Sequence, residues 1–159
     1  ATTNDIYGIV TAHETVGNGK IMMSFFAGND DEATVEFAGS TISVEGILKK
    51  FKKNIDGSMD FDTDPTTITF DLTTATYEVD VTGNKITDTA GNVYYLASDA
   101  VIYICEKYDA TNSVYGKVTK TDDALEIEDS ANNGIELFQV DDKSDANYGQ
   151  ITYVVITRA

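Results

Sequence analysis

Apolar and polar residues alternate with a period of two along most of the chain, and Gly-, Asn- and Asp-rich turn signals interrupt this alternation at short intervals. Ile68, Phe70 and Leu72, for example, alternate with threonine and aspartate. This period is typical of half-buried β-strands, whereas an amphipathic helix needs apolar residues three and four positions apart. About a dozen short strands joined by such turns are typical of a sandwich or barrel. The sequence therefore predicts an all-β fold, built as one or two small β-barrels or sandwiches of short antiparallel strands.

The expected strands follow one another mostly as hairpins. They cover residues 6–11, 20–27, 33–37, 67–72, 77–81, 85–88, 93–96, 101–105, 114–120, 124–127, 135–140 and 151–157. The segment 101–105 is almost wholly apolar, so we expect both of its faces to be covered. Only residues 47–61 are ambiguous. Asp56-Gly57 favours a hairpin there, and the apolar spacing allows at most one short helix, over residues 47–55.

One segment recurs in similar form. Residues 5–11 read Asp-Ile-Tyr-Gly-Ile-Val-Thr, residues 113–119 read Ser-Val-Tyr-Gly-Lys-Val-Thr, and four of the seven positions are identical. The similarity indicates either two copies of a barrel-opening strand or separate use of a common strand vocabulary. Because no Gly/Ser- or Pro-rich linker divides the chain, we expect a single β-rich module over 1–159, or two packed lobes over 1–112 and 113–159.

Net charge narrows the classes of partner. The 159 residues include 27 Asp and Glu but only 11 Lys and Arg, which gives a formal charge of −16. Binding to nucleic acid needs basic side chains that neutralise phosphates, so this class is excluded, and anionic lipid surfaces are disfavoured. No apolar run approaches the ~18 residues that span a bilayer, so we expect no membrane insertion. A hydrophobic fraction of 42% is nevertheless that of a folded domain.

Residues for catalysis are scarce. The chain has one His and one Cys, and neither lies in a pattern that activates a nucleophile. His13 ends the first strand, and Cys105 lies in the apolar segment, where a thiol acts as a small hydrophobe. We therefore expect a protein that is not an enzyme, with no catalytic residues and no required cofactor.

Calcium is the one metal that the sequence suggests. Asp60, Asp62 and Asp64 place three carboxylates at alternate positions, and carboxylate oxygens are calcium ligands. Pro65 stands where an EF-hand loop needs glycine, so the expectation is a looser surface site. The alternative is a solvated acidic surface.

Tyrosine is frequent. The nine tyrosines are Tyr7, Tyr77, Tyr94, Tyr95, Tyr103, Tyr108, Tyr115, Tyr148 and Tyr153. Exposed tyrosine rings provide stacking platforms for sugars, and their hydroxyls bond to sugar hydroxyls. Most of these residues fall at alternating strand positions, where packing in a core or interface is the alternative.

The terminal strands and one basic segment bear on assembly. Ile6 and Tyr7 open the first strand, and Val154 and Ile156 lie in the last. Unpaired edges there would accept a strand from a neighbouring copy, whereas pairing within the chain would satisfy both edges.

The basic segment is short. Four of the eleven basic residues lie within residues 49–53, among them Lys49 and Lys50. These lysines either meet an acidic surface of a neighbouring copy or protect an edge strand from aggregation. The expected partners are other copies of the chain or neighbouring modules of a surface protein.

Three segments, in order along the chain, carry a resemblance to a known family. They are Tyr7-Gly8-Ile9-Val10-Thr11, the segment 91–103 (Gly-Asn-Val-Tyr-Tyr-Leu-Ala-Ser-Asp-Ala-Val-Ile-Tyr), and Tyr153-Val154-Val155-Ile156-Thr157. Together they resemble the β-rich modules of bacterial surface-layer proteins that carry S-layer homology anchoring domains. The resemblance implies an extracellular structural or adhesive role at the bacterial cell surface, with no catalytic residues.

The function expected from the sequence follows from these features. It is a non-enzymatic structural module of a bacterial surface layer or filament, which self-associates through β-edges and responds to cations. A glycan- or calcium-binding module of a secreted or cell-surface protein is the alternative.

Overall fold

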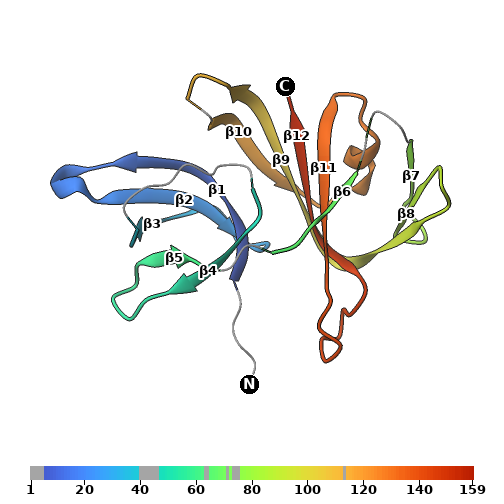
Figure 1. The fold of residues 1–159 in the computed structure, drawn as a ribbon, viewed down its shortest axis with the longest axis horizontal. Coiled ribbons are helices and arrows are strands. Elements are labelled where there is room, and N and C mark those ends of the chain that lie inside the picture. Colours follow the sequence, from blue (N-terminus) through green and yellow to red (C-terminus); the bar gives the residue numbers. More distant parts are fainter. Residues whose placement is uncertain (1–5, 40–46, 63–64, 71, 73–75, 113) are drawn as a thin grey trace. The chain divides into compact units, whose positions relative to one another are not determined.

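The chain is all-β in a computed structural model that describes residues 6–39, 47–62, 65–70, 72, 76–112 and 114–159 (Figure 1), which confirms the expected fold class. Two short 3₁₀ helices, η1 (Gly17–Gly19) and η2 (Ala124–Glu128), are the only helical segments among these residues. None of the described helices has the length and apolar character needed to cross a membrane.

The chain divides into two compact units. The barrel unit comprises Ala1–Pro65 and Tyr108–Val118, and the half-barrel unit comprises Thr66–Lys107 and Thr119–Ala159. The units therefore alternate along the sequence. A hairpin of β9 (Val93–Asp109) and β10 (Val114–Thr121) carries the chain from one unit to the other and back.

Five strands close the barrel. They are β1 (Ile6–Thr15), β2 (Ile21–Ala27), β3 (Ala33–Phe37), β4 (Lys49–Lys53) and β5 (Met59–Phe61). The order around the barrel is β1-β2-β3-β5-β4, and β4 pairs with β1 to close it. β3 and β5 run parallel, with Phe37 opposite Met59. This is the Greek-key order of the five-stranded OB-type barrel.

Local features of β1 allow it to pair on both edges. The register against β2 shifts between Val10 and Ala12, and such a bulge bends a strand and increases its twist. Gly8 has β2 on one side and β4 on the other. A Cβ atom at this position would overlap the carbonyl group of Phe26, so the close approach of β2 requires glycine.

Phenylalanine dominates the interior of the barrel. The ring of Phe51 lies 5.2 Å from that of Phe25 and 5.6 Å from that of Phe61, between centroids. Phe37 lies 5.0 Å from Phe61, and Met23 is fully buried in the same cluster. A few large side chains thus fill the narrow space inside a five-stranded barrel.

The ambiguous segment is a hairpin, which confirms the favoured interpretation. β4 and β5 pair antiparallel, and no helix occurs within the described residues 47–55. The turn is closed by Asn54 N–H, which donates to the Ser58 carbonyl at 2.8 Å. The Asp56 carboxylate accepts from both the backbone N–H and the hydroxyl of Ser58, at 3.0 and 2.6 Å. Local turn chemistry therefore decides this element.

The half-barrel unit is a strongly curved sheet. Besides β9 up to Lys107 and the end of β10, its strands are β6 (Ile68–Phe70), β7 (Tyr77–Asp80), β8 (Lys85–Asp88), β11 (Asn132–Gln139) and β12 (Ile151–Arg158). The order is β6-β11-β12-β9-β8-β7, with β10 paired to β9. β9 and β12 run parallel in the centre of the sheet.

Branched aliphatic residues fill the inside of the curve. The buried cluster is Phe70, Ile86, Leu96, Ile102, Ile104, Ile127, Ile135, Leu137, Ile151, Val154 and Ile156. Although β6 and β7 are the two ends of the sheet, the rings of Phe70 and Tyr77 stack with centroids 4.0 Å apart. The sheet is therefore curled until its ends meet through side chains.

Two elements differ from the sequence expectations. The predicted strands 93–96 and 101–105 are parts of one 17-residue strand, β9. Residues 101–105 are buried, which confirms that both faces are covered. The expected strand 124–127 is wrong, because these residues form η2, where the Asp123 carboxylate accepts from Leu125 N–H at 3.0 Å and caps the helix.

Candidate functional site

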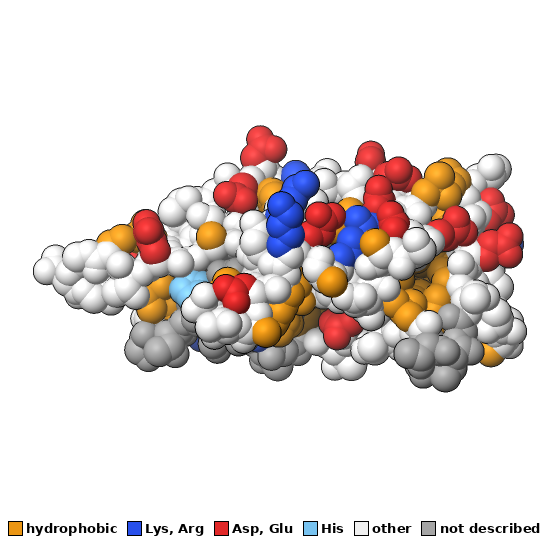
Figure 2. Space-filling view, turned by 90° about the horizontal axis from the view of Figure 1, so that it is seen from above, with side chains coloured by type: hydrophobic (Ala, Val, Ile, Leu, Met, Phe, Trp, Pro, Cys, Tyr) orange, Lys and Arg blue, Asp and Glu red, His pale blue; other side chains and the backbone are white. Residues whose placement is uncertain are grey.

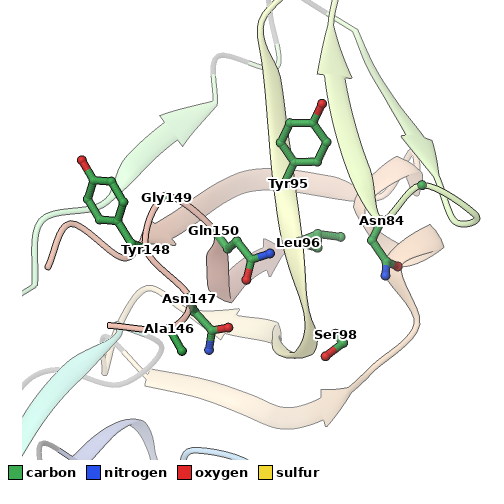
Figure 3. A pocket seen from close by; sticks show the side chains of 10 residues that line it. Asn84, Tyr95, Leu96, Ser98, Ala146, Asn147, Tyr148, Gly149 and Gln150 are labelled. Atoms are coloured by element: carbon green, nitrogen blue, oxygen red, sulfur yellow. The ribbon is translucent and has the colours of Figure 1, made fainter. Parts of the chain in front are cut away.

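The half-barrel unit carries an open groove of about 640 Å³. Ten residues line it: Gly83, Asn84, Tyr95, Leu96, Ser98, Ala146, Asn147, Tyr148, Gly149 and Gln150. They come from the turn between β7 and β8, the first half of β9, and the loop that joins β11 to β12 (Figure 3). The volume is within the usual range for small-molecule sites.

Strand register brings these three segments together. Ile151 at the start of β12 lies opposite Leu96 in parallel β9, so the preceding loop reaches the same end of the sheet as Tyr95. Lys85 at the start of β8 pairs with Tyr95 on the other edge of β9. The Leu96 N–H donates to the Asn84 carbonyl at 2.7 Å. Leu96, which also lines the groove, is buried in the core of the unit.

Carboxylates fix the shape of the loop that joins β11 to β12. Asp142 accepts hydrogen bonds from the backbone N–H and the hydroxyl of Ser144, at 2.9 and 2.7 Å. Asp145 accepts from the Asn147 N–H at 2.8 Å. The Gly149 N–H donates to the Val140 carbonyl at 2.8 Å. These bonds hold the groove-lining part of the loop in one conformation before any ligand arrives.

The same contacts set the charge state of Asp142. The backbone N–H of Ser144, followed by its hydroxyl, lowers the pKa of the Asp142 carboxyl below the ordinary value of 3.8. Hydrogen bonds to the charged form of a carboxyl group favour that form. Asp142 is therefore ionised at neutral pH and acts as a fixed acceptor in the loop.

Two tyrosines stand out on the walls of the groove. Tyr95 is 53% exposed and Tyr148 is 50% exposed, and in the view of Figure 3 they lie on opposite sides of Gln150. Within the described part of the chain, the side chains of Asn147 and Gln150 have no hydrogen-bond partner, so their amide groups are free to bind a ligand. The groove therefore combines two apolar ring faces with amide donors and acceptors.

The groove is uncharged in an acidic protein. None of its ten described lining residues is Asp, Glu, Lys, Arg or His, although the chain carries a formal charge of −16. Acidic side chains are spread over the face seen in Figure 2. A neutral polar lining favours a neutral polar ligand, because a buried or half-buried charge needs a partner of opposite sign.

The predicted calcium ligands belong to the barrel unit, whereas the groove belongs to the half-barrel unit. Asp60 in β5 accepts from the Phe61 N–H at 2.8 Å, Asp62 forms an ion pair with Lys50 at 3.9 Å, and Asp64 lies outside the described residues. No group of three His, Cys, Asp or Glu side chains suited to a metal occurs among the described residues. Calcium binding stays a prediction.

Both terminal strands pair on two sides within the chain. Ile6 and Tyr7 lie opposite Phe51 and Lys50 of β4, and the other edge of β1 pairs with β2. β12 lies between β11 and β9, and its Val154 and Ile156 are fully buried. Of the two possibilities raised by the sequence, the structure therefore has the one in which both terminal strands pair within the chain.

The basic segment divides into two kinds of lysine. Lys49 is buried, with its ammonium group 5.2 Å from the centre of the Phe61 ring. Lys50 pairs with Asp62. Lys52 and Lys53 are exposed, so they, rather than the predicted Lys49 and Lys50, present positive charge to solvent.

The groove was not predicted as a site from the sequence. Tyr95 and Tyr148 are two of the nine tyrosines, but nothing local in the sequence links two residues so far apart. The sequence does contain one signal. Adjacent Tyr94 and Tyr95 in a strand must point to opposite faces, so one of the two rings faces away from the core. Neither a protein-family model, nor a curated protein, nor a solved structure matches the chain.

Proposed function

We propose that this protein is a non-enzymatic glycan-binding module and that the groove of the half-barrel unit is its binding site. The observation that carries the proposal is the pair of half-exposed rings, Tyr95 and Tyr148, on the walls of an uncharged groove. Pyranose rings have apolar C–H faces and polar edges. An aromatic face and an amide group at one site match these two features.

The shape of the groove supports weak, reversible binding. It is open to solvent, and buried Leu96 is among its lining residues. The side chains of Asn147 and Gln150 supply directional hydrogen bonds, while the hydrogen-bonded loop reduces the entropy lost on binding. Two stacking contacts and a few solvent-exposed hydrogen bonds correspond to dissociation constants of about 10 μM to 1 mM.

The direct test is titration calorimetry with soluble neutral polysaccharides, such as β-glucans, mannans and galactans. Tyr95→Ala and Tyr148→Ala are each expected to weaken binding at least tenfold. Tyr108→Ala is the matched control, since Tyr108 is 45% exposed but packs edge-on against Tyr115 in the barrel unit. Tyr95→Phe keeps the ring face and is expected to retain most of the affinity.

Two results would contradict the proposal. One is that the intact protein binds none of the tested polysaccharides, even at millimolar concentrations of binding sites. The other is binding that persists unchanged when both Tyr95 and Tyr148 are replaced by alanine, with circular dichroism showing an intact fold.

A second candidate function is a structural module of a bacterial surface layer, located outside the cell and associated with copies of itself. The observation that favours it is the exposed basic hairpin of Lys52 and Lys53 on a chain with a formal charge of −16. Because opposite charges attract across an interface, such a hairpin suits a contact with an acidic copy. Ordered assembly at high concentration, seen by electron microscopy, is the expected result.

Calcium is an optional ligand in this second function. Cations that bind only the folded state raise its stability by mass action. We expect calcium to raise the melting temperature more than sodium at equal ionic strength, and Asp60→Asn/Asp62→Asn to remove the difference. Equal effects of the two salts would instead indicate simple charge screening.

A further inference from the structure

We infer that the tip of the β4–β5 hairpin of one copy docks on η2 of a second copy, head to tail. The two surfaces lie on different units, the hairpin on the barrel unit and η2 on the half-barrel unit. This contact is independent of the groove. It rests on the second candidate function and names the surfaces that would build the assembly.

The hairpin presents an apolar residue beside two positive charges. Ile55 at the turn is fully exposed, and Lys52 and Lys53 precede it with exposed side chains. In the described part of the chain the side chains of these three residues form no hydrogen bond or ion pair, although the backbone of the two lysines pairs with β5. The turn itself is held by the side chains of Asn54 and Asp56, which bond to Ser58. An isoleucine on a fixed turn loses little entropy when it is covered.

The opposite surface presents an apolar residue among negative charges. Leu125 in η2 is 50% exposed, and the neighbouring acidic residues Asp122, Asp123, Glu128 and Asp129 are all exposed. Like the hairpin, this surface is held rigidly. Ile127 anchors η2 in the core, and the Glu128 carboxylate accepts from the Val79 N–H at 2.7 Å.

The two surfaces match in both apolarity and charge. Ile55 can cover Leu125 while Lys52 and Lys53 face the acidic residues around it. Within one chain the two surfaces are different, so the contact is heterologous and repeats from copy to copy as an open chain or a ring. The apolar area is small, which makes each contact weak, and the charged rim makes it sensitive to salt.

Two one-sided variants test this geometry. Lys52→Glu/Lys53→Glu disables the hairpin, and Asp122→Lys/Leu125→Ser disables the η2 surface without touching the capping residue Asp123. In sedimentation velocity at low salt, the unmodified chain is expected to form a concentration-dependent series of oligomers. Each variant alone is expected to be monomeric at concentrations at which the unmodified chain associates, because loss of either surface weakens the contact at least tenfold.

Mixing the two variants is the decisive measurement. Each variant keeps one intact surface, so an equimolar mixture is expected to form a 1:1 dimer and nothing larger. A symmetric contact between like surfaces would give no such complementation. Ile55→Ser, which leaves the charges unchanged, is expected to weaken association of the full chain, and 0.5 M sodium chloride is expected to abolish it.

Matched controls separate this contact from a general effect of charge. Lys117→Glu/Lys143→Glu makes the same change in net charge at two other exposed lysines, and Val81→Ser removes another exposed apolar residue. Both are expected to associate like the unmodified chain. Association that survives in the Lys52→Glu/Lys53→Glu variant would overturn the inference but leave a structural function standing.

Two other outcomes would overturn more than this contact. A chain that is monomeric at millimolar concentration would overturn both the contact and the structural function. Lysine-dependent binding of a monomeric chain to phosphatidylglycerol vesicles would assign the hairpin to an anionic lipid instead of a second copy.

Discussion

The two units solve the same problem, the free edge of a β-sheet, in different ways. In the barrel unit, backbone pairing of β1 with β4 and of β3 with β5 closes the sheet on itself. In the half-barrel unit, β6 and β7 do not pair, and side chains complete the closure. Phe70 stacks on Tyr77, and the Glu128 carboxylate occupies the Val79 N–H of edge strand β7.

The two units also differ in the side chains that fill their interiors. Rings of Phe25, Phe37, Phe51 and Phe61 fill the closed barrel. The curled sheet covers a layer of Ile, Leu and Val side chains instead. A closed barrel has a fixed interior volume, whereas a sheet with two unpaired ends can adjust its curvature to its contents.

The way in which each sheet closes determines where it offers binding surfaces. Closure by backbone pairing leaves the barrel only its hairpins and loops for contacts with other molecules. Closure by side chains and inserted segments gives the half-barrel unit both the uncharged groove and the acidic η2 surface. The parallel β9–β12 pair contributes as well, because it places the start of two strands at one end of the sheet.

Truncation of a core ring in each unit gives the largest expected effect. Phe51→Ala leaves a cavity in the closed barrel and is expected to lower the free energy of unfolding by about 4–5 kcal/mol, because the surrounding strands cannot collapse into it. Phe70→Ala, at the edge of the curled sheet, is expected to cost about 3 kcal/mol. Urea unfolding measures both. Equal costs, or a larger cost for Phe70→Ala, would contradict the difference in rigidity between the units.

Loss of the charge at Arg158 gives the next largest effect. Arg158 has a side-chain exposure of 13% and lies 3.2 Å from Glu106, 2.7 Å from Glu126 and 3.6 Å from Asp129. Arg158→Met leaves these carboxylates facing one another, and about 2 kcal/mol of stability is expected to be lost, discounted for their partial exposure. Lys143→Met, at an exposed site, is the control and is expected to change stability by less than about 0.5 kcal/mol. An Arg158→Met variant as stable as that control would show that these ion pairs contribute nothing to holding η2 against the sheet.

The sequence predicts those parts of this fold that local chemistry decides. Asp56-Gly57 and Gly91-Asn92 predict turns because their side chains and backbone freedom act within a few residues. The apolar run 101–105 predicts a strand covered on both faces for the same reason. The strand predicted for 124–127 is wrong, because its apolar residues suit a strand but the cap from Asp123 stabilises a short helix instead.

Long-range pairing lies beyond such reasoning. Alternation says that a segment is a strand but not which strand lies beside it, so neither the β3–β5 contact nor the parallel β9–β12 pair could be predicted. The groove depends on the second of these pairs. From the sequence alone, Tyr95 and Tyr148 are therefore two tyrosines among nine. Only the strand register shows that they line one groove.

Acid is expected to weaken turns in both units alike. Hydrogen bonds, first from the side chain of Asn92, lower the pKa of Asp88 below its ordinary 3.8, and those of Ser58 do the same for Asp56. A lowered pKa in the folded state adds stability that is complete above about pH 4 and is lost as the pH falls through the folded-state value. Melting temperatures measured from pH 7 to pH 2.5 are expected to fall only below about pH 4. In that acid range the melting temperature of Asp88→Asn is expected to fall less steeply than that of the unmodified chain. Identical pH profiles of the two proteins would mean that the Asp88 turn contributes nothing to the acid sensitivity.

The smallest expected effect is confined to the edge of β7 and tests closure by side chains directly. The Glu128 carboxylate accepts from the Val79 N–H at 2.7 Å, in the position that a neighbouring strand would occupy in a closed barrel. Glu128→Ala is expected to lower global stability by no more than about 1 kcal/mol, since the site is exposed. Amide hydrogen exchange at Val79 is nevertheless expected to accelerate at least tenfold, because the N–H loses its acceptor while Ile9 in the barrel core is unaffected. Glu128→Gln keeps a side-chain oxygen at the same place and is expected to retain most of the protection. Unchanged exchange at Val79 in Glu128→Ala would mean that the stacked rings of Phe70 and Tyr77, and not this carboxylate, close the half-barrel.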